Sequence, residues 1–481
     1  MRRMDAVEVR PVLTASSSHQ VWPGRRTWVF PYLTPALALY SLFVLWPVVQ
    51  LFWLALQRWN GYGPRHFVGL ANLGALMSDP LFRTSLDHSL LWDAGAVFVV
   101  TPLALLLALG IRRTRFQRFF LSVLFFPALL PPAVLAAIAI LGYSPLSGPL
   151  NEVLRGIGLS FLAADWLGDP HLVLGSLFVV WLWSAIGVGA VILWSALGSI
   201  AREYRELALV EGAGTWWRLR HITLPGLRRS MLTVAAIEIV LASQAFDLVF
   251  MTTGGGPGYA TMLLPLDMYG RAFGGRAGQG AAVACIQILL VLAIILVLFL
   301  LFRTSDSLDT GERAAEARDT SPPVTVVLIA ATLFFLSPLA WLPLAAIQPG
   351  RSFALAGPSL DPGAWTLSNL TSVWNAGLGG AITTSLALAL AVVAITLVFC
   401  APAAFALTRL GWARTPILGL LIFGLIQPST VLVIPLFSLL RQLQVLGTLW
   451  GVLLPEVARS IPFATLVIWA YLAGLPREVF E

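Results

Sequence analysis

Long apolar runs constrain this chain more than any other feature of its sequence. About ten runs approach or exceed the roughly 20 residues that an α-helix needs to cross a bilayer. They lie near residues 30–55, 87–111, 118–142, 171–197, 231–252, 281–302, 323–346, 383–408, 415–438 and 449–473. Hydrophobic residues make up 58% of the chain and charged residues only 11%, which is far less charge than soluble domains carry. We therefore predict an all-α integral membrane protein with about ten transmembrane helices.

Arginine supplies all the basic side chains, because the 481 residues include no lysine. The arginines concentrate in the loops at 112–118 and 202–229 and in the polar tail at 1–27, while the alternate loops hold fewer. Short loops rich in arginine mark the cytoplasmic face. We therefore expect a cytoplasmic N-terminal tail, and we attribute the net charge of +7 to membrane orientation rather than to nucleic-acid binding.

The two halves of the chain show weak sequence similarity to each other. Asn72-Leu73 and Asn369-Leu370 precede apolar runs, Ser89 and Ser385 lie near the starts of those runs, and Arg112 and Arg409 end them, at a nearly constant separation of about 297 residues. The charged stretch at 303–322 then reads as a cytoplasmic linker. We predict two repeats, 28–302 with six spans and 323–481 with four.

One loop carries the most specific pattern, "REYRELALVEGAGTWWRLRHITLPGLRRS" from Arg202 onward. Residues 202–210 contain no Gly or Pro and predict a short helix, and Gly212 is a natural helix stop because glycine adopts the left-handed conformation cheaply. Pro225 precedes the next span. An amphipathic interfacial helix without a partner is the ordinary interpretation of such a loop.

The spacing favours a more specific interpretation. Glu206 and Ala208, then Gly212, then Ile222 to Pro225 resemble the EAA…G…I-LP loop of ABC-importer permeases, with Leu207 and Glu211 as mild departures. Stretches similar to the maltose-type sugar permeases are Phe246 to Thr261, Phe67 to Leu73 and Ala404 to Leu410. The chain thus resembles two permease types fused together. The second is incomplete, because "LPREVFE" at 475–481 resembles only the start of a loop like "IAREYRE" at 200–206.

The resemblance implies a type I ABC importer fold in a bacterial plasma membrane. It implies inward movement of a sugar or related polyol, delivered by an extracytoplasmic solute-binding protein. The loop would dock on separate cytoplasmic ATPase subunits through Glu206, Ala208, Glu211, Gly212, Ala213, Ile222, Leu224 and Pro225. The chain itself would bind no ATP and catalyse no reaction, because a phosphate-binding P-loop needs a lysine.

Polar residues inside the apolar runs are candidates for the solute path. They are Asp93, Glu238, Gln244, Asp247 and Gln287. A charge at membrane depth costs about 2.5–3.5 kcal/mol or more, so such groups usually face a cavity or a partner. Glu238, Gln244 and Asp247 share the fifth apolar run, and their spacing places them within a broad sector of one helix. Hydrogen bonding between helices is the alternative role. The five histidines show no metal-ligand spacing.

Two other functions remain open on the sequence. An ion-gradient transporter would also carry repeats and intramembrane carboxylates, but it would not need the EAA-type loop. A membrane transferase should gather acidic residues or histidines at one membrane face, and the sequence shows no such group. Sugars, polyols and glycerol phosphates all remain possible solutes.

Overall fold

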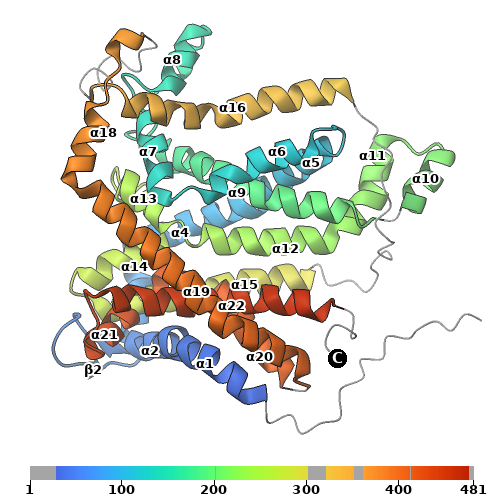
Figure 1. The fold of residues 1–481 in the computed structure, drawn as a ribbon. Coiled ribbons are helices and arrows are strands. Elements are labelled where there is room, and N and C mark those ends of the chain that lie inside the picture. The colour runs from blue at the N-terminus through green and yellow to red at the C-terminus, as the bar shows by residue number, and fades with distance from the viewer. Residues whose placement is uncertain (1–28, 201, 302–320, 351–360, 412, 476–481) are drawn as a thin grey trace, which may run out of the picture.

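The structure is a computed structural model that describes residues 29–200, 202–301, 321–350, 361–411 and 413–475. Among these residues the one sheet is a two-stranded antiparallel hairpin, in which β1 (Gln57–Arg58) pairs with β2 (His66–Phe67). Long helices run side by side, and α10 (Arg202–Val210) and α11 (Thr215–Arg218) project at one end of them (Figure 1). We call this the α10 end, and the other the opposite end.

The first 200 residues supply nine α-helices to the described structure. They are α1 (Phe30–Tyr40), α2 (Trp46–Ala55), α3 (Ala71–Ser78), α4 (Pro80–Gly95), α5 (Thr101–Ile111), α6 (Gln117–Phe125), α7 (Pro132–Gly142) and α8 (Pro149–Gly156), followed by α9 (Val173–Leu197). Short π or 3-10 turns link some of them: η2 (Ser41–Leu45), η3 (Ala96–Val100), η4 (Phe126–Leu129) and η5 (Ser160–Leu162).

The remaining elements follow α10 and α11. They are η6 (Leu219–Thr223), α12 (Leu224–Ala242), α13 (Phe246–Thr252), α14 (Leu264–Phe273), α15 (Ala277–Leu301), α16 (Pro322–Ala346), η7 (Pro362–Ala364), α18 (Ser368–Val373), η8 (Trp374–Leu378), α19 (Gly379–Arg409), α20 (Arg414–Ile426), η9 (Ser429–Leu432), α21 (Val433–Gln442) and α22 (Leu449–Ala473).

The all-α membrane prediction is confirmed. Eight helical stretches of the described residues are long and apolar enough to cross a membrane, or ten if two sharply bent pairs each count as one span. The runs near 118–142 and 415–438, predicted as ordinary spans, are those bent pairs, with bends of 96° and 91°. Proline explains both bends, because Pro131 and Pro428 take extended backbone angles and a proline nitrogen cannot continue a helical hydrogen-bond ladder.

The hydrophobic interior divides into two clusters, and the division does not follow the chain. One cluster joins α1 and α2 to α15 and to the later helices α19 to α22. The other contains residues of α4, α5, α6, α7, α9, α12 and α13, together with part of α16. The first span therefore packs against late helices, while α16 packs against α5, α6 and α7. This exchange ties the two predicted repeats together and was not predicted.

Asn72 and Asn369 occupy matching positions in the two predicted repeats. Asn72 Nδ2 donates to the carbonyls of Ala55 and Gln57, both at 2.8 Å. Asn369 Nδ2 donates to the carbonyls of Ala346 and Gln348, at 3.2 and 2.6 Å. In each case the amide satisfies carbonyls where a spanning helix has just ended, a place that otherwise leaves acceptors unpaired.

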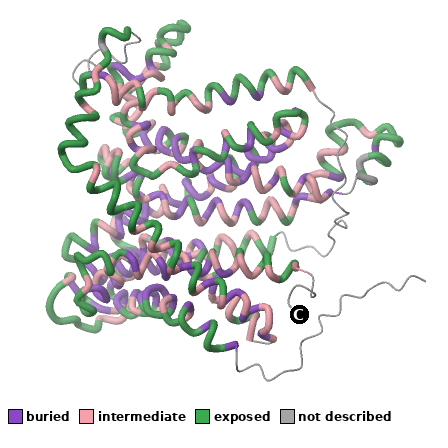
Figure 2. Tube along the Cα trace, viewed as in Figure 1, coloured by how far each residue is buried: buried purple, intermediate pink, exposed green. Residues whose placement is uncertain are grey.

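Burial is uneven across the bundle. Helices such as α9 and α12 are largely buried or half-buried, whereas α16 has few buried residues, and α18 and residues 379–394 of α19 are mostly exposed (Figure 2). The tail at 1–27, most of the linker at 303–322 and Arg477, Glu478 and Glu481 lie outside the described residues.

Candidate functional site

The loop between α9 and α12 folds as its sequence predicted. The helix α10 covers Arg202–Val210, and Gly212 follows it with φ +74°, the left-handed conformation that glycine tolerates best. Ala213 N donates to Ala208 O at 2.8 Å, which closes the end of the helix. The backbone then passes through α11 and η6 into α12, where Pro225 lies in the first turn.

Exposed apolar side chains distinguish this loop from an ordinary turn. Val210 is 87% exposed, and Leu207, Leu209 and Trp216 are also exposed. Ala208 and Ile222 face inward and are buried. Of the other predicted docking residues, Glu206, Glu211, Gly212 and Pro225 are exposed, and Ala213 and Leu224 are half-buried. We call Leu207, Leu209, Val210 and Trp216 the loop patch.

A direct covalent path links the loop patch to the membrane interior. His221 braces the turn, because its ring stacks on Trp217 at 4.6 Å and its Nδ1 lies 3.0 Å from Trp217 O. Arg228 of α12 donates to Leu301 O at the end of α15. These contacts tie η6 to α11 and α12 to α15.

Glu238 lies on α12 with no exposed surface. Neither of its carboxylate oxygens has a hydrogen-bond partner among the described residues. Gly189 of α9 permits the close packing around it, since a Cβ there would lie 3.0 Å from Val234 and 3.3 Å from Glu238 Oε1. Buried acceptors without partners are rare in folded proteins. The Glu238 carboxylate is therefore available to accept hydrogen bonds from another group.

Gln287 and Asp93 line a small cavity. The cavity measures about 10 Å³, enough for the centre of one water molecule, and lies between α4, α12, α14 and α15. Gln287 Nε2 donates to Ser243 O at 2.7 Å, while its Oε1 has no partner. The indole Nε1 of Trp92, another lining residue, also lacks an acceptor. The cavity thus combines one free donor with free acceptors.

Gln244 and Asp247 do not continue the face of α12. The helix ends at Ala242, α13 begins at Phe246, and Ala245 between them has non-helical backbone angles. The expectation that Glu238, Gln244 and Asp247 share one uninterrupted helix is therefore wrong. Gln244 is half-buried beside the Ser243–Gln287 contact, and Asp247 is exposed. Gln287 and Asp93 come together, whereas Glu238 and Asp247 lie at separate places.

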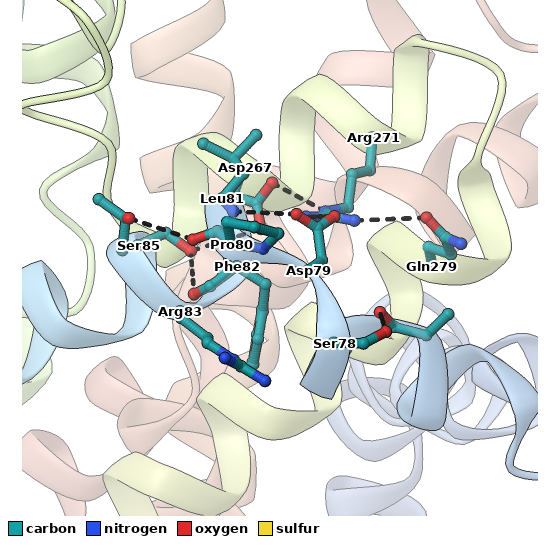
Figure 3. Close-up of polar contacts among 12 residues, drawn as sticks. Ser78, Asp79, Pro80, Leu81, Phe82, Arg83, Ser85, Asp267, Arg271 and Gln279 are labelled. Atoms are coloured by element: carbon teal, nitrogen blue, oxygen red, sulfur yellow. Dashed lines mark hydrogen bonds and ion pairs between the residues drawn. The ribbon is translucent and has the colours of Figure 1, made fainter.

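A buried ion cluster near the cavity was missed by the sequence analysis. Arg271 is 2% exposed, and its guanidinium lies 2.8 Å from both Asp267 Oδ1 and Asp79 Oδ2 (Figure 3). Gln279 Oε1 accepts from Arg271 at 3.3 Å, and Ser85 Oγ lies 3.4 Å from Asp267. The spacing of four residues between Asp267 and Arg271 was the available signal.

The two carboxylates of this cluster respond differently to their surroundings. Burial raises the pKa of Asp267 despite its contact with Arg271. Burial alone would also raise the pKa of Asp79, but hydrogen bonds from Arg271 and from Leu81 N outweigh it and hold that pKa below its usual value. The cluster joins the start of α4 to α14 and to the first turn of α15, and so fixes the elements that wall the cavity.

Known proteins resemble about half of this chain. The family model described as the inner membrane component of binding-protein-dependent transport systems matches residues 100–308. A probable ABC transporter permease of Pyrococcus horikoshii is 33% identical over 270 residues, 55% of this chain and 91% of that protein. The lactose transport permease of Rhizobium radiobacter is 30% identical over 54% of this chain and 87% of its own length.

The fold agrees with a solved transporter. A bacterial ABC transporter involved in the import of the acidic polysaccharide alginate superposes with a TM-score of 0.51 and 19% identity, over 57% of this chain and 95% of the matched chain. With the helical membrane fold and the loop at Arg202–Pro225, these likenesses assign the chain to the binding-protein-dependent ABC transporter permeases, as a permease subunit of an ABC importer.

Proposed function

We propose that the chain forms the membrane path for a sugar or related polyol and is driven by separate ATPase subunits that dock on the loop patch. The loop patch is the main observation that supports docking of an ATPase. It places four exposed apolar side chains on α10 and α11 at the end of the bundle, where a water-soluble partner can bury them. By the arginine bias of the sequence, the α10 end is cytoplasmic.

The proposed coupling is mechanical. An ATPase that binds α10 and changes conformation would move η6 and α12. The hydrogen bond from Arg228 joins α12 to α15. Glu238 and Ser243 lie on or beside α12, and Gln287 lies on α15, so this movement changes the space around them. We infer that the free acceptors of Glu238 and Gln287, with Asp93, Gln244 and Asp247, bind solute hydroxyls in another state of the cycle.

Several relatives support a sugar-like solute. They include a diacetylchitobiose uptake permease of Streptomyces coelicolor, 30% identical over 52% of this chain and 74% of that protein, together with the lactose permease. A solved form of the alginate transporter is a complex with a periplasmic protein that holds an alginate pentasaccharide. An extracytoplasmic binding protein is therefore the proposed source of solute.

We propose that 28–302 and 323–481 form two permease repeats. Helices α19 and α22 of the second repeat pack together as α5 and α9 do in the first repeat.

Docking is tested by charge substitution on the loop patch. Val210→Asp puts a carboxylate on its most exposed apolar residue, where binding would have to desolvate it. We expect the variant to reach the membrane but to lose co-purification with the ATPase. Leu70→Asp is the matched control, because Leu70 is 68% exposed next to α3, far along the chain from the loop. Equal ATPase recovery with both variants would remove the loop patch from the docking site.

A further inference from the structure

The segment between α7 and α9 carries an apolar surface that the transport path does not use. Val153, Ile157 and Phe161 are 59%, 64% and 78% exposed, and Leu146 and Leu162 are exposed beside them in sequence. The helix α8 within this segment lies at the end of the bundle away from α10 and projects past its edge (Figure 1). Its axis runs across the direction of α16 rather than along it.

Hydrogen bonds and aromatic contacts fix the backbone of this segment, and its exposed apolar side chains therefore have defined positions. Asn151 is buried, and its amide makes hydrogen bonds of 2.8 to 3.5 Å to Ala164, Trp166 and Pro145. Tyr143 lies 6.2 Å from Trp166, and its hydroxyl donates to Ser176 O on α9. The polar interior of the segment is thus satisfied while its apolar side chains point outward.

The chemistry of this surface fits lipid better than protein. Protein recognition surfaces are enriched in Tyr, Trp and Arg at their centres. The exposed residues here are aliphatic or Phe, while the exposed charges of α8, Glu152 and Arg155, occupy other positions on the helix. Half-buried Tyr143 and Trp166 match the aromatic belt found where spans leave the hydrocarbon.

We propose that α8 and the following residues to Leu162 form an interfacial anchor, whose apolar face enters the headgroup–acyl boundary of the leaflet at the opposite end. Amphipathic helices of this kind bury their apolar face roughly 5–10 Å into that boundary. The anchor fixes the depth of the adjoining ends of α7 and α9. A push on α10 at the other end of α9 then tilts this helix rather than sliding it through the bilayer.

Spin labelling of the full chain in phospholipid vesicles tests the anchor. Single cysteines replace Val153 or Phe161 on the apolar face, and Glu152 or Arg155 as matched controls on the same segment. All four native side chains are exposed, so labels there leave the fold intact. The native Cys285 and Cys400 are buried, and the unsubstituted chain measures any background labelling.

The readout is the accessibility of each label to oxygen, which concentrates in lipid, and to a water-soluble nickel chelate. We expect a several-fold higher oxygen-to-nickel ratio at Val153→Cys and Phe161→Cys than at Glu152→Cys and Arg155→Cys. Equal, nickel-dominated accessibility at all four sites would overturn the anchor. So would apolar positions that become protected only when an extracytoplasmic protein is added, since that result would make the surface a protein-docking site.

Discussion

Arg271 offers the sharpest test of how the opposite end is held together. Replacing it with alanine leaves Asp267, which is 2% exposed, and the partly buried Asp79 without their shared counter-charge. Removing one partner of a buried ion pair costs about 3–5 kcal/mol, because the remaining charge stays buried and unpaired. The cost stays near the lower end if water reaches Asp79, whose side chain is 26% exposed.

The chain provides its own control. Arg459 and Glu456 also form an ion pair at 2.8 Å, but their side chains are 55% and 43% exposed. Exposed pairs of this kind contribute roughly 0–1 kcal/mol. Arg459→Ala should therefore leave stability nearly unchanged, although it removes the same type of side chain from an ion pair of the same length.

Thermal unfolding in detergent measures the difference. Cys285 and Cys400 are both buried and free, so a dye that fluoresces on reacting with thiols reports the exposure of the core. Arg271→Ala should lower the unfolding midpoint by several degrees, and Arg459→Ala should not. Arg271→Met combined with Asp267→Leu removes both buried charges and should recover much of the loss. Equal midpoints for Arg271→Ala and Arg459→Ala would refute the cluster as a structural tie.

Further predictions rest on close packing and on matched hydrogen bonds. Gly187→Ala should destabilise the chain by the same dye assay, because its Cβ would overlap the carbonyl of Leu124; Gly175→Ala on the same helix has open space and should not. Asn72→Ala should cost about 1–3 kcal/mol by leaving two buried carbonyls unpaired. Asn369→Ala, at a half-buried position, should cost less; the reverse order would contradict the burial argument. Gly212→Val should reduce ATPase co-purification because φ is +74° there, whereas Gly214→Ala, at φ −64°, should retain it.

Most of the helices could be predicted from the sequence, because a helix that crosses the bilayer requires a long run of apolar residues. Residues 202–210 were predicted as a helix with a stop at Gly212, and both predictions are confirmed. The positions paired by the repeat, Asn72 and Asn369, turn out to make the same contacts. These features depend on local composition or on spacing along the chain, which a single sequence contains.

The features that were missed depend on tertiary contacts or local backbone geometry. The chain bends by 96° and 91° at Pro131 and Pro428, although the hydropathy there remains that of a continuous run. The break at 243–245 contains no Gly or Pro to signal it. The exchange of α1 and α16 between the two clusters joins residues hundreds of positions apart. The contact between Arg271 and Asp79 was missed because the two residues lie far apart in the sequence.

Solute uptake into right-side-out membrane vesicles from cells that carry the transporter tests the central claim most directly. Uptake of a labelled sugar would be measured with and without ATP inside the vesicles, and with and without an ionophore that collapses ion gradients. The account predicts uptake that requires internal ATP, survives the ionophore and is lost with Val210→Asp. Uptake that proceeds without ATP and disappears with the ionophore would contradict it and would indicate a gradient-driven transporter.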